Sequence, residues 1–329
     1  MTVRFAVGKI LGAFGTLAFV LVFNFFLFRI VEKDPVATLY RGRNLTDAQR
    51  DALTHQFGLD GSKLEQFGRY VEQTLQLNLG RSYATNQPVI DEIWAAAPQT
   101  IALVGVATVL SMVFGILMGI SAGWQRGTNQ DRLLTSSSMA TWSTPDFWLG
   151  MILLTSLAVS LGLFPTGGIE DPAANATGLE RLLDQAWHMT LPCLTLTIAY
   201  VGEFALIMRS SMLDVMREDY LTLARAKGLR DSQVRNRHAV RTALLPSTAL
   251  VAINFGFVLS GAIAVETVYS WPGLGLLTYE SLRGPDLPVL QGLFLVFSAT
   301  VIVFNLVAEL AYPLLDPREI GRASCRERV

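Results

Sequence analysis

The sequence predicts an all-α polytopic membrane protein with six transmembrane helices. Of its 329 residues 51% are hydrophobic and only 16% are charged, whereas a soluble domain carries about 25% charged residues. Six long runs contain almost no Asp, Glu, Lys or Arg, and each approaches or exceeds the about 20 residues that a helix needs to cross the hydrocarbon core. The runs are continuously apolar and lack the alternation of an outer-membrane barrel. The predicted spans are residues 10–28, 93–125, 135–169 (interrupted by Asp146), 185–202, 242–265 and 287–308.

Basic residues in the short loops predict the orientation of these spans. One side of the membrane holds thirteen of them: Arg4, Lys9, Arg126, Arg132, Arg209, Arg217, Arg225, Lys227, Arg230, Arg235, Arg237, Arg241 and Arg318. The short loops on the opposite side hold only Arg181 and Arg283. We therefore expect a protein of the cytoplasmic (inner) membrane, in contact with lipid, with both termini and the loop 209–245 in the cytoplasm.

The order of the spans divides the chain into four parts. Residues 1–31 are the N-terminal tail and first span, 32–92 an extracytoplasmic insert, 93–315 the five-helix membrane domain, and 316–329 the C-terminal tail. Residues 320–329 resemble the conceptual translation of a sequencing adapter, so we expect them to be non-native and exclude them from the argument.

The insert contains two helix signals. Residues 46–49 read Thr-Asp-Ala-Gln, a capping box that opens a short helix. Leu64, Phe67, Val71 and Leu75 then fall on one helical face. We expect this stripe to pack on the membrane domain, with binding of an external partner as the alternative.

Composition and motif spacing exclude several classes of function. The formal net charge of -1 argues against a nucleic-acid binder, and the apolar content argues against disorder. Cys193, Cys325 and the three histidines show no spacing typical of a metal site or a nucleophile pair. The single Gly-Lys pair, Gly8-Lys9, is followed by Ile10 rather than Ser or Thr, so there is no P-loop. We expect no catalytic residue and no bound metal, and any ATP must be hydrolysed by another chain.

The cytoplasmic stretch 212–246 is the most informative part of the sequence. It predicts a helix with an acidic start at Glu218 and Asp219, small residues at Ala224 and Ala226, and a stop at Gly228. A second, basic helix follows and ends at a proline where the chain enters the membrane. Small residues would let another protein approach the backbone, and the flanking charges would set its register. A loop that only fixes membrane topology explains the same pattern equally well.

The residues of this stretch also carry a resemblance. Ala-Arg-Ala-Lys-Gly at 224–228, followed by Arg-His-Ala-x-Arg-x-Ala-Leu-Leu-Pro at 237–246, resembles the EAA loop of ABC-importer permeases, more narrowly the dipeptide/oligopeptide/nickel family. The stretches 145–150, 266–275 and 315–318 also match that family in order and spacing. Two departures are Thr-Leu-Ala at 222–224, where the family has Glu-Ala-Ala, and Leu206, where it has an arginine.

The resemblance implies a type I ABC importer (MetI-like) permease fold and alternating access. It implies three kinds of partner: a second homologous permease, two ATPase subunits that bind ATP and Mg, and an extracytoplasmic solute-binding protein. This chain itself would bind no cofactor. The cargo would be dipeptides or oligopeptides, with nickel chelates, haem or opines as alternatives. The residues that would couple to the ATPases are Glu218, Asp219, Tyr220, Ala224, Arg225, Ala226, Lys227 and Gly228.

Polar residues inside predicted spans are costly and suggest function. Glu203, Asn254 and Asp146 are candidates for the translocation pathway, but hydrogen bonds between helices explain them equally well. Glu203 or Asp146 could also be the coupling carboxylate of an ion-driven secondary transporter, although no inverted repeat is evident.

Two glycine patterns complete the sequence analysis. Trp271, Pro272, Gly273 and Gly275 cannot form regular helix, and the resemblance makes them a periplasmic turn near the pore mouth. A structural turn is the simpler interpretation. The second span contains Gly105, Gly115, Gly119 and Gly123, a set that includes small-xxx-small spacings and predicts close helix packing.

Overall fold

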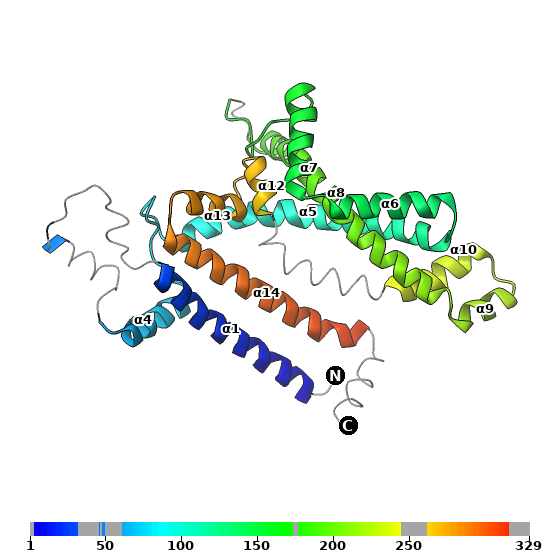
Figure 1. Ribbon diagram of the computed structural model, residues 1–329, viewed down its shortest axis with the longest axis horizontal. Helices are drawn as coiled ribbons and strands as arrows, with labels where there is room; N and C mark the ends of the chain where they lie inside the picture. Colours follow the sequence, from blue (N-terminus) through cyan, green and yellow to red (C-terminus); the bar gives the residue numbers. More distant parts are fainter. Residues whose placement is uncertain are drawn as a thin grey trace.

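The computed structural model describes residues 3–31, 46, 48–49, 61–173, 177–244 and 262–315. Side chains are described for these residues except 3–4 and 29–31 in the first helix and 311–315 in the last. Within these residues the chain is helical apart from loops and one isolated bridge between Arg81 and Pro88 (Figure 1). The long helices are α1 (Val3–Val31), α5 (Val89–Trp124), α8 (Leu179–Val215) and α14 (Leu287–Leu315). The shorter elements are α4 (Lys63–Leu75), α6 (Asn129–Ser143), α7 (Asp146–Leu153), η1 (Leu154–Ser160), α9 (Asp219–Ala226), α10 (Asp231–Gln233), η2 (Val234–Ala239), α12 (Ile263–Val268) and α13 (Leu274–Arg283).

The four long helices are the ones long and apolar enough, among the described residues, to cross a membrane. They correspond to the first, second, fourth and sixth predicted spans. The third predicted span is divided between α6 and α7–η1, because Pro145 lacks an N–H and Thr144 before it is extended, with ψ of 126°. Most of the fifth span, including Asn254, and the tail 316–329 lie outside the described residues. The six-span count therefore remains a prediction.

The close packing predicted for the second span is confirmed where α5 meets α8. A Cβ added at Gly115, Gly119 or Gly123 would lie 2.6 Å from the Cβ of Phe204, Met208 or Met212 respectively. Each glycine therefore lets the two backbones approach more closely than any side chain would allow. At Gly105, by contrast, an added Cβ would meet nothing within 4 Å.

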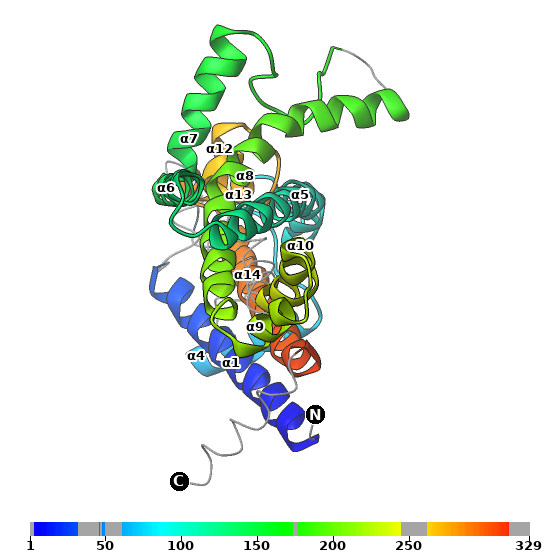
Figure 2. The same ribbon diagram turned by 90° about the vertical axis from the view of Figure 1, so that its right-hand side faces the viewer.

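Helices α1 and α14 form a second pair, which runs side by side in both ribbon views (Figures 1 and 2). The buried Asn24 side chain of α1 donates to the Gln291 carbonyl of α14 at 3.2 Å and to the Tyr70 hydroxyl of α4 at 3.0 Å. Phe25 also contacts the rings of Phe67 and Tyr70. The middle of the insert helix α4 is thereby fixed against α1.

The insert confirms one expectation and corrects another. Thr46 and Gln49 exchange the two reciprocal hydrogen bonds of the predicted capping box. The predicted stripe on α4 is only partly buried, because Leu64 and Leu75 are 79% and 75% exposed. Phe67 of the stripe does contact Phe25 of α1, together with Tyr70, which the stripe did not include.

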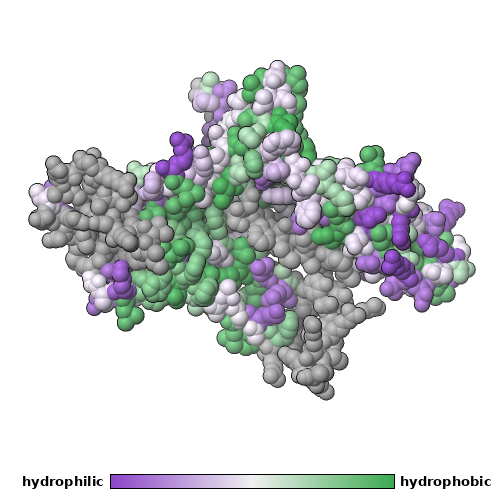
Figure 3. All heavy atoms as spheres, in the orientation of Figure 1, coloured by the Kyte–Doolittle hydropathy of each residue, from purple (hydrophilic) through white to green (hydrophobic). Residues whose placement is uncertain are grey.

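Hydrophilic residues gather at one end of the molecule. Figure 3 shows them over α9, α10 and the adjoining end of α6, whereas the surface around α13 and α14 is mainly hydrophobic. This distribution agrees with a helical bundle that spans a membrane and carries a polar segment at one end.

Candidate functional site

Helix α9 begins and ends where the sequence predicts. Glu218 is its N-cap and Asp219 lies in its first turn, where an acidic side chain favours the helix dipole. At the other end the N–H of Gly228 donates to the Arg225 carbonyl at 2.9 Å, and that of Leu229 to the Ala224 carbonyl at 3.4 Å. These two bonds form a Schellman motif, which requires the left-handed φ of +79° that Gly228 adopts.

One face of α9 packs against the C-terminal ends of α5 and α8. Leu221 and Ala224 are 0% and 6% exposed. They belong to a buried apolar group that we call the α9 cluster: Met208, Met212, Val215, Leu221, Ala224, Val234, Ala239 and Ala243, with Ile116, Ile120, Trp124, Val240 and Leu244 packed against it. Because this cluster joins α9 to α5 and α8 by close-packed side chains, a displacement of α9 acts on both long helices.

The other face of α9 is open. Asp219, Tyr220, Arg225, Ala226, Lys227 and Gly228 are exposed, as are Glu218, Thr222 and Leu223. Two of these exposed side chains also contact the rest of the protein. The Tyr220 hydroxyl donates to Thr242 Oγ1 at 3.2 Å, and the Arg225 guanidinium lies 5.7 Å from the ring centroid of Trp124 in α5. Ala224 alone among the predicted coupling residues faces inward, so it packs the α9 cluster and is not available to an outside surface.

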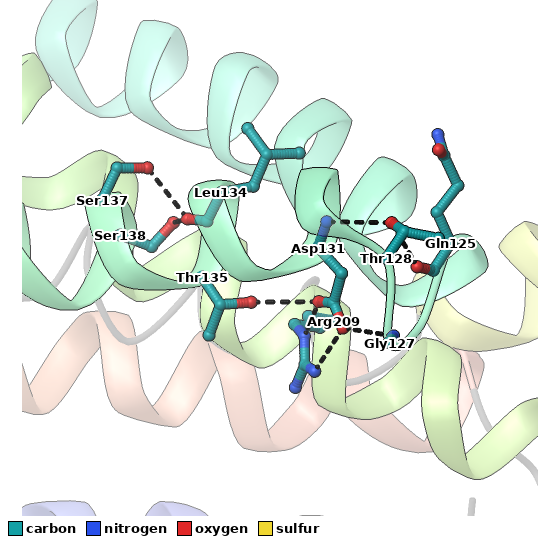
Figure 4. A network of polar contacts seen from close by, with 9 residues as sticks. All are labelled: Gln125, Gly127, Thr128, Asp131, Leu134, Thr135, Ser137, Ser138 and Arg209. Atoms are coloured by element: carbon teal, nitrogen blue, oxygen red, sulfur yellow. Dashed lines mark hydrogen bonds and ion pairs between the residues drawn. The ribbon is translucent and has the colours of Figure 1, made fainter.

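An ion pair that sequence reasoning missed lies at the same end of the molecule (Figure 4). The carboxylate of Asp131 in α6 accepts from Arg209 Nε at 2.7 Å and Nη2 at 3.0 Å, and from the Gly127 N–H at 2.9 Å. Asp131 is 4% exposed, and the hydrogen bonds from Arg209 hold the pKa of its carboxyl well below the usual range. The pair ties α6 to α8 just before the third predicted span. An acidic residue in a loop that is otherwise basic was the available signal.

The turn before α13 is a buried structural joint. Trp271 is 2% exposed and its indole N–H donates to the Gln99 carbonyl of α5 at 3.0 Å. Gly273 and Gly275 are also buried, and only Pro272 of the four predicted residues is exposed. The hydroxyl of the neighbouring Tyr269 contacts Thr195 Oγ1 of α8 at 2.9 Å and donates to the Gly150 carbonyl of α7 at 3.0 Å. The turn therefore connects α5, α7 and α8.

The pathway candidates are only partly placed by the structure. Glu203 and Asp146 are half-buried. The Asp146 carboxylate accepts from the N–H of Phe147 at 2.6 Å, a local contact at the start of α7. Among the described residues no group of three or more His, Cys, Asp or Glu side chains is placed to hold a metal ion.

Comparison with known proteins covers almost the whole chain. The family described as binding-protein-dependent transport system inner membrane component matches residues 111–321, and the model of the N-terminal part of such components matches residues 2–104. The chain is 35% identical over 316 residues to the glutathione transport system permease protein GsiC of Pectobacterium atrosepticum, covering 95% of this chain and 98% of that protein. It is 34% identical over 313 residues to the di/tripeptide transport system permease protein DppB of Pseudomonas aeruginosa, covering 91% and 93%.

These matches confirm the resemblance carried by the α9 segment and by residues 266–275. They extend through the four long apolar helices as well. The chain belongs to the family of binding-protein-dependent transport system inner membrane components.

Proposed function

We propose that this chain is the membrane permease of an ATP-driven importer that moves peptides across the cytoplasmic membrane by alternating access. The observation that carries the proposal is α9, a short helix with an open polar face and a buried face that is fused to two membrane helices. A partner that binds the open face of such a helix can displace it, and the buried face transmits the displacement to the membrane helices. The names of the relatives, glutathione and di/tripeptide transport permeases, support small peptides as the cargo class.

The proposal includes the partners and the orientation in the membrane. The permease pairs with a second homologous permease, binds two ATPase subunits through α9, and receives peptide from an extracytoplasmic solute-binding protein. ATP and Mg are held by the ATPases. The chain crosses the membrane six times, with α9 and both termini in the cytoplasm and the insert 32–92 outside.

The mechanism follows from the contacts of α9. A nucleotide shifts a conformational equilibrium only by its differential affinity for the two states. Closure of the ATPase pair on ATP must therefore change the contact with the open face of α9, which includes Tyr220, Arg225 and Lys227. The α9 cluster then moves the ends of α5 and α8, while the Asp131–Arg209 pair makes α6 follow α8. The spans change their access from one side of the membrane to the other.

The test uses the chain expressed with its neighbouring genes, purified in detergent and placed in liposomes. We expect two ATPase subunits and a second permease to co-purify, and ATP hydrolysis to rise when binding protein and peptide are added. A chain that purifies alone and moves solute under an ion gradient without ATP would refute the proposal.

A substitution at Gly228 tests the role of α9 itself. Gly228→Asp should abolish ATP-coupled uptake without preventing membrane insertion, because a carboxylate at the exposed end of α9 would block close docking. Gly80→Asp is the matched control. Gly80 has a similar φ of +86° and, like Gly228, has nothing within 4 Å of an added Cβ, but it lies in the insert. Both variants carry the same backbone strain and charge, so uptake that falls equally in both would count against docking at α9.

A further inference from the structure

Glu266 is a buried carboxylate that holds the turn before α13 against α5. It is 0% exposed. Its Oε1 accepts from Thr100 Oγ1 of α5 at 2.7 Å, and its Oε2 accepts from the N–H groups of Gly275 at 2.7 Å and Leu276 at 3.2 Å. Thr100 Oγ1 in turn accepts from the N–H of Leu274 at 2.8 Å. Within the described part of the chain these donors are neutral, and no ion pair of Glu266 is present.

The glycines of the turn make room for this carboxylate, because any larger residue would place its Cβ against it. A Cβ at Gly273 would lie 2.3 Å from Glu266 Oε2 and 2.4 Å from Thr100 Oγ1, and one at Gly275 would lie 2.9 Å from the same Oε2. The first N–H groups of the ten-residue helix α13 point at the negative charge, which the helix dipole favours. A buried carboxylate that loses such donors is left unsatisfied, at a high cost. The hydrogen bonds between Thr100 of α5, Glu266 and the start of α13 therefore depend on one another.

The same helix carries both this joint and the α9 cluster. Ile116, Ile120 and Trp124 of α5 pack against the α9 cluster, and Thr100 lies about 36 Å away along the helix axis from Trp124. α8 repeats the arrangement, since Met208 and Met212 lie in the α9 cluster and Thr195 bonds to Tyr269 of the turn. Two long helices therefore connect the α9 cluster, which lies at their C-terminal ends, to the turn, which contacts α5 at Thr100 and α8 near its middle at Thr195.

We infer that Glu266 is a positioning residue that makes the turn, residues 269–275, move with α5, so that a displacement of α9 reaches the opposite side of the membrane. This inference rests on the proposed importer function. The turn then moves together with α5 and α8 when the ATPases bind ATP. The Glu266–Thr100 hydrogen bond is necessary for communication between the ATPases and the extracytoplasmic side.

The test is a double-mutant cycle in the reconstituted complex. The variants are Glu266→Gln, which keeps the shape and removes the charge, Thr100→Val, which removes the hydroxyl, and the double variant. Basal ATP hydrolysis and its stimulation by the binding protein with peptide are measured separately. Asp286→Asn is the matched control, because Asp286 is also a buried carboxylate, 2% exposed, that accepts from a hydroxyl, Ser82 Oγ, at 2.6 Å and from backbone N–H groups. It anchors the segment before α5 rather than α5 itself.

We expect each single variant to lower the stimulation at least fivefold while basal hydrolysis stays within twofold of the wild type. The double variant should be no worse than either single one, since both remove the same contact. Asp286→Asn should keep its stimulation, and Thr100→Ser, which keeps the hydroxyl, should restore it. If Glu266→Gln and Thr100→Val keep the wild-type stimulation of ATP hydrolysis, the inference is overturned. It is also overturned if the two losses of stimulation multiply in the double variant, or if Asp286→Asn loses as much stimulation as they do. A wild-type complex that shows no ATP-dependent uptake would refute the proposed function instead.

Discussion

The close contact between α5 and α8 makes Gly119→Ala the most direct test of the packing. The added methyl group would lie 2.6 Å from the Ala205 carbonyl oxygen and 2.6 Å from Met208 Cβ, whereas carbon atoms in contact are about 3.5–4.0 Å apart. The two helices would have to separate by about 1 Å at this point. Overpacking of this kind costs about 1–3 kcal/mol.

Gly105→Ala is the control that isolates this cost. Gly105 lies on the same helix and has nothing within 4 Å of an added Cβ. Both variants gain the same preference of alanine over glycine in a helix, about 0.5–1 kcal/mol. The difference between their stabilities is therefore the overpacking cost alone.

Thermal unfolding in detergent measures the difference, with a thiol-reactive dye as the probe. Cys193 lies in α8 and is 5% exposed, so it reacts when α8 leaves its neighbours; Cys325→Ser removes the other thiol of the sequence. A loss of 1 kcal/mol lowers Tm by about 2–4 °C in a domain of about 150–250 residues. We expect Gly119→Ala to melt at least about 2 °C below Gly105→Ala. Equal melting temperatures, or a more stable Gly119→Ala, would refute the packing argument.

Two further predictions concern the α9 end of the molecule. Leu221→Ala should destabilise the chain by about 2–5 kcal/mol because Leu221 is fully buried. Leu223→Ala, at a site 56% exposed, should leave Tm unchanged and weaken co-purification with the ATPases; the reverse pattern would contradict the assigned faces. Asp131→Asn should lower stability by about 3 kcal/mol because it leaves Arg209 unpaired. Since the folded-state pKa of Asp131 is depressed, its contribution is complete above its ordinary value of 3.8 and is lost only as the pH falls below it. The deficit measured in thermal unfolding should therefore be equal at pH 5 and pH 8, and a deficit that shrinks at pH 5 would count against the pair.

The limits of α9 could be predicted because its signals are local. An acidic N-cap region and a glycine at the C′ position act within one or two turns of the backbone, so the sequence alone places both ends. Which side chains of α9 are buried, by contrast, is not determined by neighbouring residues in the sequence. Ala224 and Ala226 are both small and lie two positions apart, yet one is buried in the α9 cluster and the other is open. Only the docking of α9 on α5 and α8 decides between them.

Contacts between distant segments were beyond sequence reasoning for the same reason. Asp131 and Arg209 are 78 residues apart, and Thr100 and Glu266 are 166 residues apart. Each residue by itself is compatible with a loop or a helix end, and nothing in the local pattern names its partner. The break at Pro145, by contrast, carried a local signal that the length of the apolar run obscured.

The sequence by itself determined the class of this protein, its main apolar helices, the start and stop of α9 and the family to which it belongs. These properties depend on composition, on the length of apolar runs and on short motifs, which act locally or through the solvent that a segment prefers. The tertiary structure alone decided which face of α9 is fused to the bundle, and that the turn before α13 is closed on α5 by a buried carboxylate. Such contacts exist only when helices far apart in the chain are brought together, because a buried polar group is satisfied by whichever donors the packing places beside it.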